Sequence, residues 1–493
     1  MKRSKLFLSS ALAISLTVTS AIPVSSFGKI IVYDSPTAET LEFYEYWKDK
    51  YFRQDKYVTD ETQYYIYYSE EAYSGNNYSV PVTVSEAHGY GMLIFANMAE
   101  YDSNSKKYFD GMYNFYKAHP SDIGSHLMSW QQSDNGSALI DGAVDGSMTG
   151  GSCDSATDGD MDIAYALLLA DKTWGSNGEI NYLNEAKAVI NDIMKYDINQ
   201  EFWTISLGDW VSECDDSEIY YHATRPSDFI MNYFPAFARA SGDDNWMNVY
   251  NTTYEIIDEF INQNDTGLLP DFVIRENDGT FKAAPSDLLE SEHDGAYYYN
   301  SCRTPWRISV DFLINKNKTA WEFANQISDF MFKTSNGDPW EIMAGYELNG
   351  TAFEDYNDLC FTAPLLTASL CGNNSEWHDS IRNVLLNYGN DVYYGDTIKL
   401  MCLMLDDGCW NTTEYDKAPV LGDVNDDGEF SIADLVALSN YLLGAAPLSA
   451  FTNADMDHDG TIDVADLIIL RKLSVLDINE PDIPLYDSGD IYA

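Results

Sequence analysis

Apolar residues recur at helical spacing through most of this 493-residue chain, and this pattern constrains the fold more than any other feature. Three such runs are Ile163, Leu167, Ala170 and Trp174; Leu183, Ala186, Ile190 and Ile193; and Val249, Thr253, Ile256 and Phe260. Residues three and four positions apart share one face of an α-helix, whereas the alternation typical of strands is scarce here. Many helices of about 12 to 16 residues predict one large all-α domain, either a ring of helices or a helical repeat array.

The charge of the chain limits its partners. Its 28 Lys and Arg residues against 79 Asp and Glu residues give a formal net charge of −51, while 45% of the residues are hydrophobic and 14% are aromatic. That apolar content excludes a disordered acidic tail protein and predicts a substantial core. A field this negative repels phosphate backbones and anionic lipid headgroups, so nucleic acid and membrane surfaces are poor partners. We expect a neutral or cationic partner.

The N-terminus has the pattern of a secretory signal peptide. Basic residues within the first five positions precede an apolar stretch over residues 6–18, and small residues follow at positions 19–21. We therefore predict a signal peptide over residues 1–27 and a secreted, extracellular protein. An uncleaved anchor is the alternative, but the stretch is short for a membrane span, and no later stretch approaches about 18 consecutive apolar residues.

The cysteines predict neither a disulfide scaffold nor a zinc site. They number seven, are widely spaced, and include no CxxC pair. Buried free thiols are therefore expected, and in a secreted protein these favour an environment poor in oxygen.

Two Asp-rich loops recur near the C-terminus at a spacing of 32 residues. Each has oxygen-bearing side chains at positions 1, 3, 5, 7, 9 and 12 and a sharp-turn Gly at position 6, which is the ligand pattern of a calcium loop. Position 12 is Asp in both loops, where EF-hands have Glu. An apolar run follows each loop, as expected for a helix that packs beneath it. The predicted ligands of two calcium ions are Asp423, Asn425, Asp427, Glu429, Ser431, Asp434, Asp455, Asp457, Asp459, Thr461, Asp463 and Asp466.

Two tandem loop-helix units of this form resemble a type I dockerin, over about residues 421–478. The resemblance implies docking onto a cohesin domain of a cellulosome scaffold. In that family loop positions 10 and 11 help to choose the cohesin, and here they are Ile432-Ala433 and Val464-Ala465. The two pairs are nearly the same, which would permit docking in either of two orientations.

Two segments of the large domain combine acidic residues with aromatic residues and glycine. In the first, over residues 84–92, Glu86 opens an apolar helix with Ser85 available as its N-cap. Glu86 could be a first-turn residue favoured by the helix dipole, or a general acid whose pKa burial raises. In the second, over residues 156–174, three acidic residues at every second position open a long helix. At first sight they could form a cation site or an N-cap cluster. They are Asp158, Asp160 and Asp162.

Together these segments resemble glycoside hydrolase family 8. Further segments occur in the order expected for that family, the first of them between these two: Leu127–Trp130, Leu207–Trp210, Arg225–Phe229, Tyr297–Arg307 and Tyr393–Asp396. The resemblance covers about residues 40–412 and implies an (α/α)6 barrel with an open cleft for a β-linked glycan, cleaved with inversion and without a cofactor. The predicted order along the chain is signal peptide (1–27), family 8 catalytic domain (28–414), linker (415–420), type I dockerin (421–478) and acidic tail (479–493).

The resemblance also assigns catalytic roles. Glu86 matches the general acid, and Asp158 matches the acid that holds and distorts the sugar at the cleavage subsite. Many members have an Asp base where this chain has Asn300, which cannot accept a proton. Some members with Asn there use a Glu of the preceding loop, so we expect Glu290 to be the base. The next candidates are Glu292 and then Asp294, and a catalytically dead binder without a base is the alternative.

Four further residues are candidates for substrate binding. Trp130 and Trp210 could stack on sugar rings or belong to the core. Arg303 could steady a carboxylate through its fixed fork of donors, and Asp228 could contact a sugar hydroxyl. The resulting hypothesis is a secreted endo-acting hydrolase of β-1,4-glucan or mixed-linkage β-glucan. A xylanase or chitosanase of the same family, or a non-catalytic glycan-binding component of a cellulosome, remains open.

Overall fold

The computed structural model describes the large helical region and parts of the C-terminal repeats. The described residues are 35–69, 75, 79–142, 153–315, 317–389, 392–416, 422–425, 430–446, 448, 453–454, 456 and 461–475. The predicted signal peptide, residues 417–420 of the predicted linker and the predicted tail lie outside them. No helix within the described part of the chain is both long and apolar enough to cross a bilayer.

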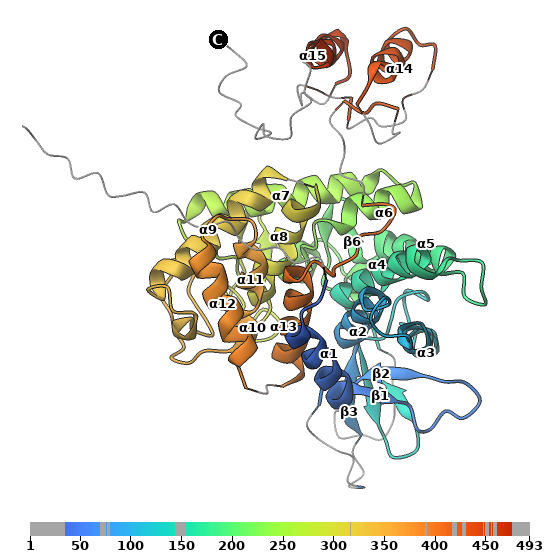
Figure 1. Cartoon of the computed structure of the whole chain (residues 1–493), viewed down its shortest axis with the longest axis vertical. Helices are drawn as coiled ribbons and strands as arrows, with labels where there is room; N and C mark the ends of the chain where they lie inside the picture. Colours follow the sequence, from blue (N-terminus) through green and yellow to red (C-terminus); the bar gives the residue numbers. More distant parts are fainter. Residues whose placement is uncertain are drawn as a thin grey trace, which may run out of the picture.

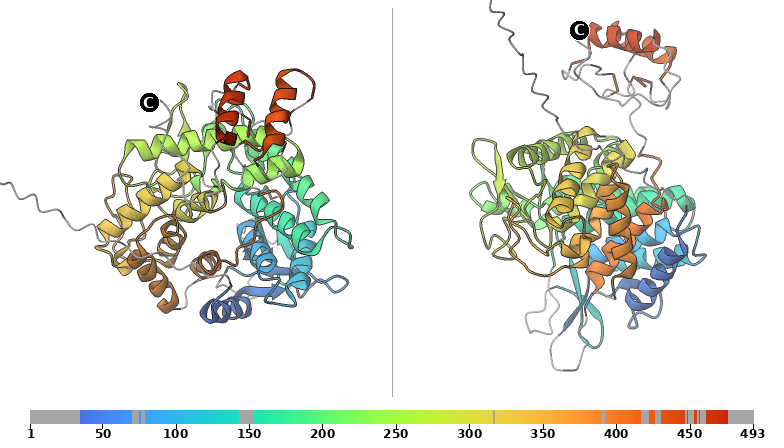
Figure 2. Two further views of the ribbon diagram at one scale, coloured as in Figure 1. Left: turned by 45° about the horizontal axis from the view of Figure 1, so that its top comes forward. Right: turned by 60° about the vertical axis from the view of Figure 1, so that its left-hand side comes forward.

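One layer of the large region consists of helices that are buried nearly all round, as helices inside a large core must be. They are α2 (Ser85–Asn97), α4 (Thr157–Trp174), α6 (Tyr233–Ser241), α8 (Thr304–Asn315), α10 (Leu359–Thr362), α11 (Pro364–Ser369) and α13 (Tyr393–Asp406). α2 buries every residue except Glu86, and α4 buries every residue from Thr157 to Ala170. Figure 2 shows these helices within a ring.

A second layer of helices covers the first, and each of its members buries one stripe of residues. They are α1 (Ala38–Tyr51), α3 (Ser105–Ala118), α5 (Tyr182–Asp192), α7 (Asn245–Gln263), α9 (Lys318–Thr334) and α12 (Ser375–Asn387). α1 packs against α13, so the first and last helices of the large region meet. The prediction of a mainly helical fold is thus confirmed. All seven cysteines are free thiols and six are buried, also as predicted.

Short antiparallel strands, which the sequence pattern did not predict, connect several of the helices. They are β1 (Phe52–Gln54) with β2 (Tyr64–Ile66); β3 (Val80–Val84), β4 (Gln131–Asp134) and β5 (Leu139–Asp141); β6 (Ile198–Asn199) with β7 (Thr204–Ile205); and β8 (Ala223–Thr224), β9 (Val273–Arg275) and β10 (Phe281–Ala283). With two to five residues each, they are too short for alternation to stand out. β3 leads directly into α2 and so sets where that helix begins.

The two ends of α2 and α4 face different parts of the molecule. Glu86 and Asp158 lie in their first turns. Near their C-terminal ends, Asn97 accepts a hydrogen bond from the backbone N–H of Asn411 (2.5 Å), and Lys172 donates one to the carbonyl of Thr412 (2.5 Å). Residues 411–412 therefore lie at the end opposite the two acids, about 20 Å away at 1.5 Å per helical residue.

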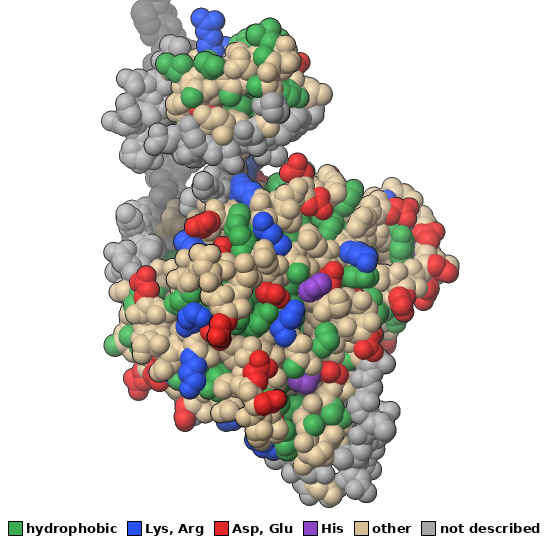
Figure 3. Space-filling model, turned by 90° about the vertical axis from the view of Figure 1, so that its right-hand side faces the viewer, with side chains coloured by type: hydrophobic (Ala, Val, Ile, Leu, Met, Phe, Trp, Pro, Cys, Tyr) green, Lys and Arg blue, Asp and Glu red, His purple; other side chains and the backbone are tan. Residues whose placement is uncertain are grey.

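The C-terminal repeats form a separate pair of helices, α14 (Ile432–Leu442) and α15 (Val464–Val475) (Figure 1). Their core contains Leu438 and Leu470, both fully buried. The predicted apolar runs do not all pack inward: Val436, Leu443 and Ile468 are each more than half exposed. Figure 3 accordingly shows hydrophobic side chains on the surface of this pair.

Candidate active site

Close contact between α2 and α4 brings Glu86 beside Asp158. A Cβ atom on Gly159 would lie 2.6 Å from the carbonyl carbon of Ser85, and one on Gly89 would lie 2.6 Å from the Cβ of Asp162. Larger residues would force the helices apart, since real Cβ atoms do not approach so closely. These glycines therefore set the spacing of the two acids.

The predicted N-cap of α2 is wrong. Val84 is the N-cap residue, with extended backbone and no side-chain cap. Ser85 is already helical, and its backbone N–H donates to the carbonyl of Trp130 (2.9 Å) beside the β3–β4 pair. Strand pairing has taken the place of a capping side chain and holds the start of the helix.

The surroundings of Glu86 favour its protonated form. Its carboxylate accepts hydrogen bonds from Arg303 (Nη1 to Oε2, 2.8 Å) and from the hydroxyl of Tyr393 (3.0 Å). Burial nevertheless raises the pKa of Glu86 to about 7, against the positive charge of Arg303 and with help from the negative charge of Asp158. A carboxyl with this pKa holds a proton near neutral pH, as a general acid must.

The surroundings of Asp158 favour its ionised form. Burial by itself raises its pKa, but Arg225 and Arg303 outweigh burial and lower the pKa to about 2. Arg303 donates to Asp158 (Nη1 to Oδ2, 2.9 Å), and Arg225 lies 3.8 Å from the other carboxylate oxygen. The two neighbouring acids thus have pKa values pushed in opposite directions.

Arg303 lies behind the acids and is not open to substrate. Its side chain is 2% exposed, and its guanidinium donates to Glu86, Asp158 and the Oδ1 of Asn300 (3.0 Å). The expectation that it steadies a carboxylate matches this geometry, whereas the expectation of direct sugar binding does not. Its buried fork of donors links the acids of α2 and α4 to Asn300.

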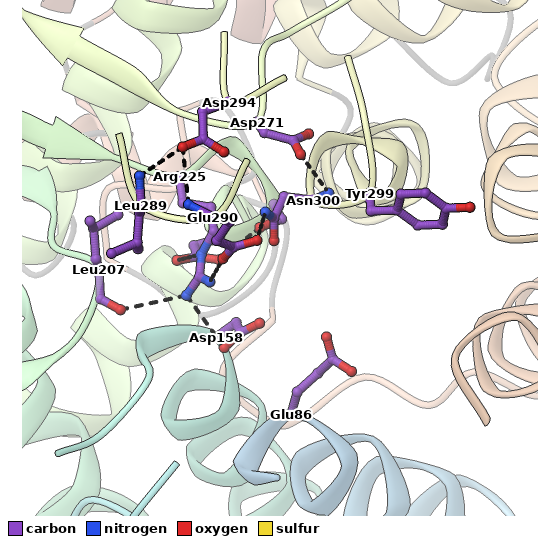
Figure 4. Close-up of polar contacts among 12 residues, drawn as sticks. Glu86, Asp158, Leu207, Arg225, Asp271, Leu289, Glu290, Asp294, Tyr299 and Asn300 are labelled. Carbon is purple, nitrogen blue, oxygen red and sulfur yellow. Dashed lines mark hydrogen bonds and ion pairs between the residues drawn. The ribbon is translucent and has the colours of Figure 1, made fainter. Parts of the chain in front are cut away.

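Glu290 approaches the same site from the loop over residues 287–294 (Figure 4). One oxygen of its carboxylate accepts a hydrogen bond from the Nδ2 of Asn300 (2.8 Å), and the other lies 3.7 Å from Arg225. Its side chain is 46% exposed, so water can reach it. Glu290 is therefore an accessible carboxylate beside the position where many family members have Asp.

Asp294 holds this loop in place. Its fully buried carboxylate accepts hydrogen bonds from the backbone N–H groups of Leu289 (2.7 Å), Glu290 (3.1 Å) and Ser291 (2.8 Å). With its lone pairs engaged and no solvent contact, Asp294 is poorly placed to activate a water. Glu292 makes no hydrogen bond to Asn300 or Arg225 among the described contacts, so the geometry favours Glu290 of the three candidates.

The other predicted substrate-binding residues have different surroundings. Trp130 is 37% exposed and lies next to the start of α2 through its bond to Ser85. Trp210 is partly buried on a small core, with its ring 5.2 Å from that of Tyr220. Asp228 is fully buried behind Arg225, whose Nε donates to it (3.2 Å), and burial raises its pKa to about 6. The structure thus does not expose Asp228 to a sugar hydroxyl.

Sequence reasoning did not single out Arg225, Tyr393 or Asp271. Arg225 and Tyr393 stood within recognised segments, three residues before Asp228 and at the start of Tyr393–Asp396. Asp271 accepts the backbone N–H groups of Asn300 (3.1 Å) and Ser301 (2.7 Å) and so fixes Asn300. No local sequence signal marks that role, because Asp271 is 29 and 30 positions from its two partners.

The three alternating acids of α4 serve separate purposes and form no common cation site. Asp158 joins the carboxylate cluster, Asp160 accepts the backbone N–H of Met128 (2.8 Å), and Asp162 forms a two-pronged pair with Arg307 (2.9 and 2.6 Å). Nowhere in the described residues do three or more His, Cys, Asp or Glu side chains gather as metal ligands.

The structure describes only part of the two predicted calcium loops. Asp427, Glu429, Asp455, Asp457 and Asp459 lie outside the described residues. In both loops the position-12 Asp is fully buried and closes the loop: Asp434 accepts the backbone N–H groups of Val424 (2.8 Å) and Ser431 (2.7 Å), and Asp466 accepts those of Met456 (2.7 Å) and Asp463 (2.8 Å). The predicted ligand set is entirely oxygen, which calcium prefers.

Comparison with known families agrees with this geometry. The family model for glycosyl hydrolases family 8 matches residues 29–408, and that for the dockerin type I domain matches residues 421–473. The chain belongs to glycosyl hydrolase family 8. This family 8 glycoside hydrolase is 45% identical over 333 residues to a beta-glucanase of Niallia circulans, covering 67% of this chain and 78% of the relative.

Two further comparisons extend this result. An endoglucanase of Bacillus sp. strain KSM-330 is 33% identical over 388 residues, 78% of each chain. The solved apo structure of a beta-1,3-1,4-glucanase from Paenibacillus sp. X4 is 40% identical, with a TM-score of 0.67 and coverage of 78% of this chain and 98% of that one. The family 8 hydrolase thus carries a type I dockerin, a module class that binds calcium and cohesin domains.

Proposed function

We propose that this enzyme cleaves β-1,4-glucan or mixed-linkage β-glucan within the chain and with inversion at the anomeric carbon. Relatives named beta-glucanase and endoglucanase support a glucan substrate. The observation that carries the proposal is the pair formed by a buried carboxyl with a raised pKa and an accessible carboxylate on a different element. We also propose that the two layers of helices in the large region form a closed (α/α)6 barrel.

The two carboxyls divide the reaction between them. Glu86 gives its proton to the glycosidic oxygen as that bond to the anomeric carbon breaks. Glu290 takes a proton from a water whose oxygen attacks the same carbon from the opposite face, so the configuration inverts. Inverting enzymes hold the two carboxyls about 6.5 to 9.5 Å apart to leave room for this water.

The remaining charged residues support these two roles. Asp158 stays ionised beside Glu86 and is proposed to hold the sugar at the cleavage subsite. Arg303 orients Glu86 and Asp158 together, and Asn300 orients Glu290 by its amide hydrogen bond. Their contacts run without a gap from the acid to the base, through Arg303 and Asn300.

The C-terminal module is proposed to bind two calcium ions through the twelve loop residues and to attach the enzyme to a cohesin. Ile432 and Val464, at loop position 10, are 76% and 61% exposed and so available to a partner. We further propose that residues 1–27 direct export, so that the enzyme works in an extracellular cellulosome. Replacing Asp423 and Asp455 by Ala should abolish calcium-dependent cohesin binding, measured by calorimetry with and without chelator.

Product release from purified polysaccharides tests the catalytic proposal. Wild type and Glu86→Gln are compared on barley β-glucan, carboxymethylcellulose, xylan and chitosan at equal concentration. We expect the wild type to release reducing sugar fastest from a glucan and Glu86→Gln to lose about 10²- to 10⁴-fold, the usual contribution of a general acid. Preference for xylan or chitosan would overturn the substrate assignment, and no activity on any polymer would favour a binding component.

A further inference from the structure

Away from the carboxylates, an exposed tryptophan lies on a tyrosine. Trp340 is 45% exposed, and its ring is stacked nearly parallel on that of Tyr388, with centroids 5.2 Å apart and planes 18° apart. The stack covers only one face of the indole, so the high exposure belongs to its other side. A tryptophan placed only to fill a core would be buried on both faces.

The loops that carry this stack are held rigidly. Trp340 lies in the 3-10 helix Pro339–Glu341, whose N-cap Asp338 accepts its backbone N–H (3.1 Å). The amide of Asn357 donates to the carbonyls of Pro339 (3.2 Å) and Ile342 (2.8 Å). The hydroxyl of Tyr388 donates to the carbonyl of Asn357 (3.4 Å). The aromatic surface is therefore preorganised, which lowers the entropy cost of binding.

Two tyrosines connect the loop of this stack to the residue beside the proposed base. Tyr356, next to Asn357, is 42% exposed, and its hydroxyl lies 3.1 Å from that of Tyr299. Tyr299 immediately precedes Asn300, and Figure 4 shows its ring pointing away from Asn300 and the acids. Tyr299 and Tyr356 thus lie between Asn300 and Asn357, and Asn357 bonds both Tyr388 and the loop that carries Trp340.

We propose that Trp340, Tyr388 and Tyr356 form a distal platform that binds a β-linked glycan chain beyond the catalytic cleft. This rests on the proposed function, since it deepens the same substrate path. The free indole face stacks on the C–H face of a pyranose ring, as aromatic rings do with apolar surfaces of matching shape. Exposed Asp338 and Glu341 flank the platform, so it favours a neutral chain over an anionic one.

A pair of tryptophan variants tests the platform. Trp340→Ala is compared with Trp321→Ala, because Trp321 is equally exposed (43%) but lies on α9. The measured quantity is the ratio of kcat/KM on barley β-glucan to that on cellotetraose, which has only four sugar rings. Trp340→Ala should lower this ratio about tenfold, the equivalent of one aromatic stacking contact, and Trp321→Ala should leave it unchanged.

Binding without hydrolysis separates failure of the platform from failure of the proposed function. In the Glu86→Gln background, migration through a gel containing β-glucan should be less retarded when Trp340 is Ala, and Trp340→Phe should be intermediate. If Trp340→Ala leaves both the ratio and the retardation as in wild type, the platform is overturned. Equal losses on polymer and tetrasaccharide, which would indicate damage to the cleft, also overturn it. A wild type that hydrolyses no glucan overturns the proposed function alone.

Discussion

The two proposed catalytic carboxyls are held in opposite ways. Glu86 stands on a buried helix, with its side chain 17% exposed, and its position follows from the packing of α2 on α4. Glu290 stands on a loop, with its side chain 46% exposed, and its position follows from hydrogen bonds to other side chains. An acid needs burial to keep its proton, whereas a base needs water and donors to stay ionised. Helix packing thus places the acid, and a polar network places the base.

The position of the base, Glu290, should be more sensitive than that of the acid, Glu86, to the loss of a polar contact. Asp294→Asn leaves one acceptor oxygen for three backbone N–H groups and turns an amide toward them, so the loop that carries Glu290 should shift. A shift of about 1 Å can cost about 10²-fold, and we expect kcat on β-glucan to fall by that order. Asp278→Asn, in an exposed turn, is the control and should keep full activity. Unchanged kcat in Asp294→Asn would mean that the loop is fixed by other contacts.

The position of the acid, Glu86, should be more sensitive than that of Glu290 to added side-chain volume between the helices. Gly159→Ala places a methyl group against Ser85, and overpacking of this kind costs about 1–3 kcal/mol, more than the roughly 1 kcal/mol that alanine gains in helix propensity. Thermal unfolding should show a lower Tm, with a lower kcat because Glu86 moves away from Asp158. Gly178→Ala has open space around its new methyl group and serves as the control. A Tm equal to that of wild type in Gly159→Ala would contradict the account of helix packing.

The smallest expected effect is a shift in the pH profile. A general acid must be protonated, so kcat/KM should fall as the pH rises past the pKa of Glu86 at about 7. The hydroxyl of Tyr393 stabilises the carboxylate form, so Tyr393→Phe should raise this pKa and move the alkaline limb upward by up to roughly one unit. Tyr46→Phe, whose hydroxyl bonds Asp396, should leave the limb in place. Movement of the limb to lower pH would contradict the role given to Tyr393.

The same contrast explains what the sequence could predict. Glu86 and Asp158 stand in contiguous motifs on periodic helices, so pattern and resemblance together found them. The choice of Glu290 over Asp294 depends on which carboxylate the loop turns inward, and that depends on backbone contacts with no sequence period. Arg225 and Asp271 reach partners far along the chain, Asp158 and Asn300, which single-sequence reasoning cannot pair. The short strands and the extended backbone of Val84 were not predicted for the same reason. Their conformation is determined by tertiary strand pairing and not by local propensity.

The position of the acids at one end of α2 and α4 also bears on assembly. Asn411 and Thr412, a few residues before the predicted linker, lie at the other end of these helices. A cohesin bound to the dockerin would thus attach the enzyme by the end remote from Glu86. Activity on β-glucan should therefore be the same with and without a bound cohesin.

The most direct test of the central claim compares Glu290→Gln with Glu292→Gln. Both remove one carboxylate from the same loop, and only Glu290 is bonded to Asn300. The measurement is the initial rate of reducing-sugar release from barley β-glucan at equal enzyme concentration. The account predicts a loss of about 10²- to 10⁴-fold in Glu290→Gln and a rate close to wild type in Glu292→Gln. The reverse order, or full activity in Glu290→Gln, would contradict it.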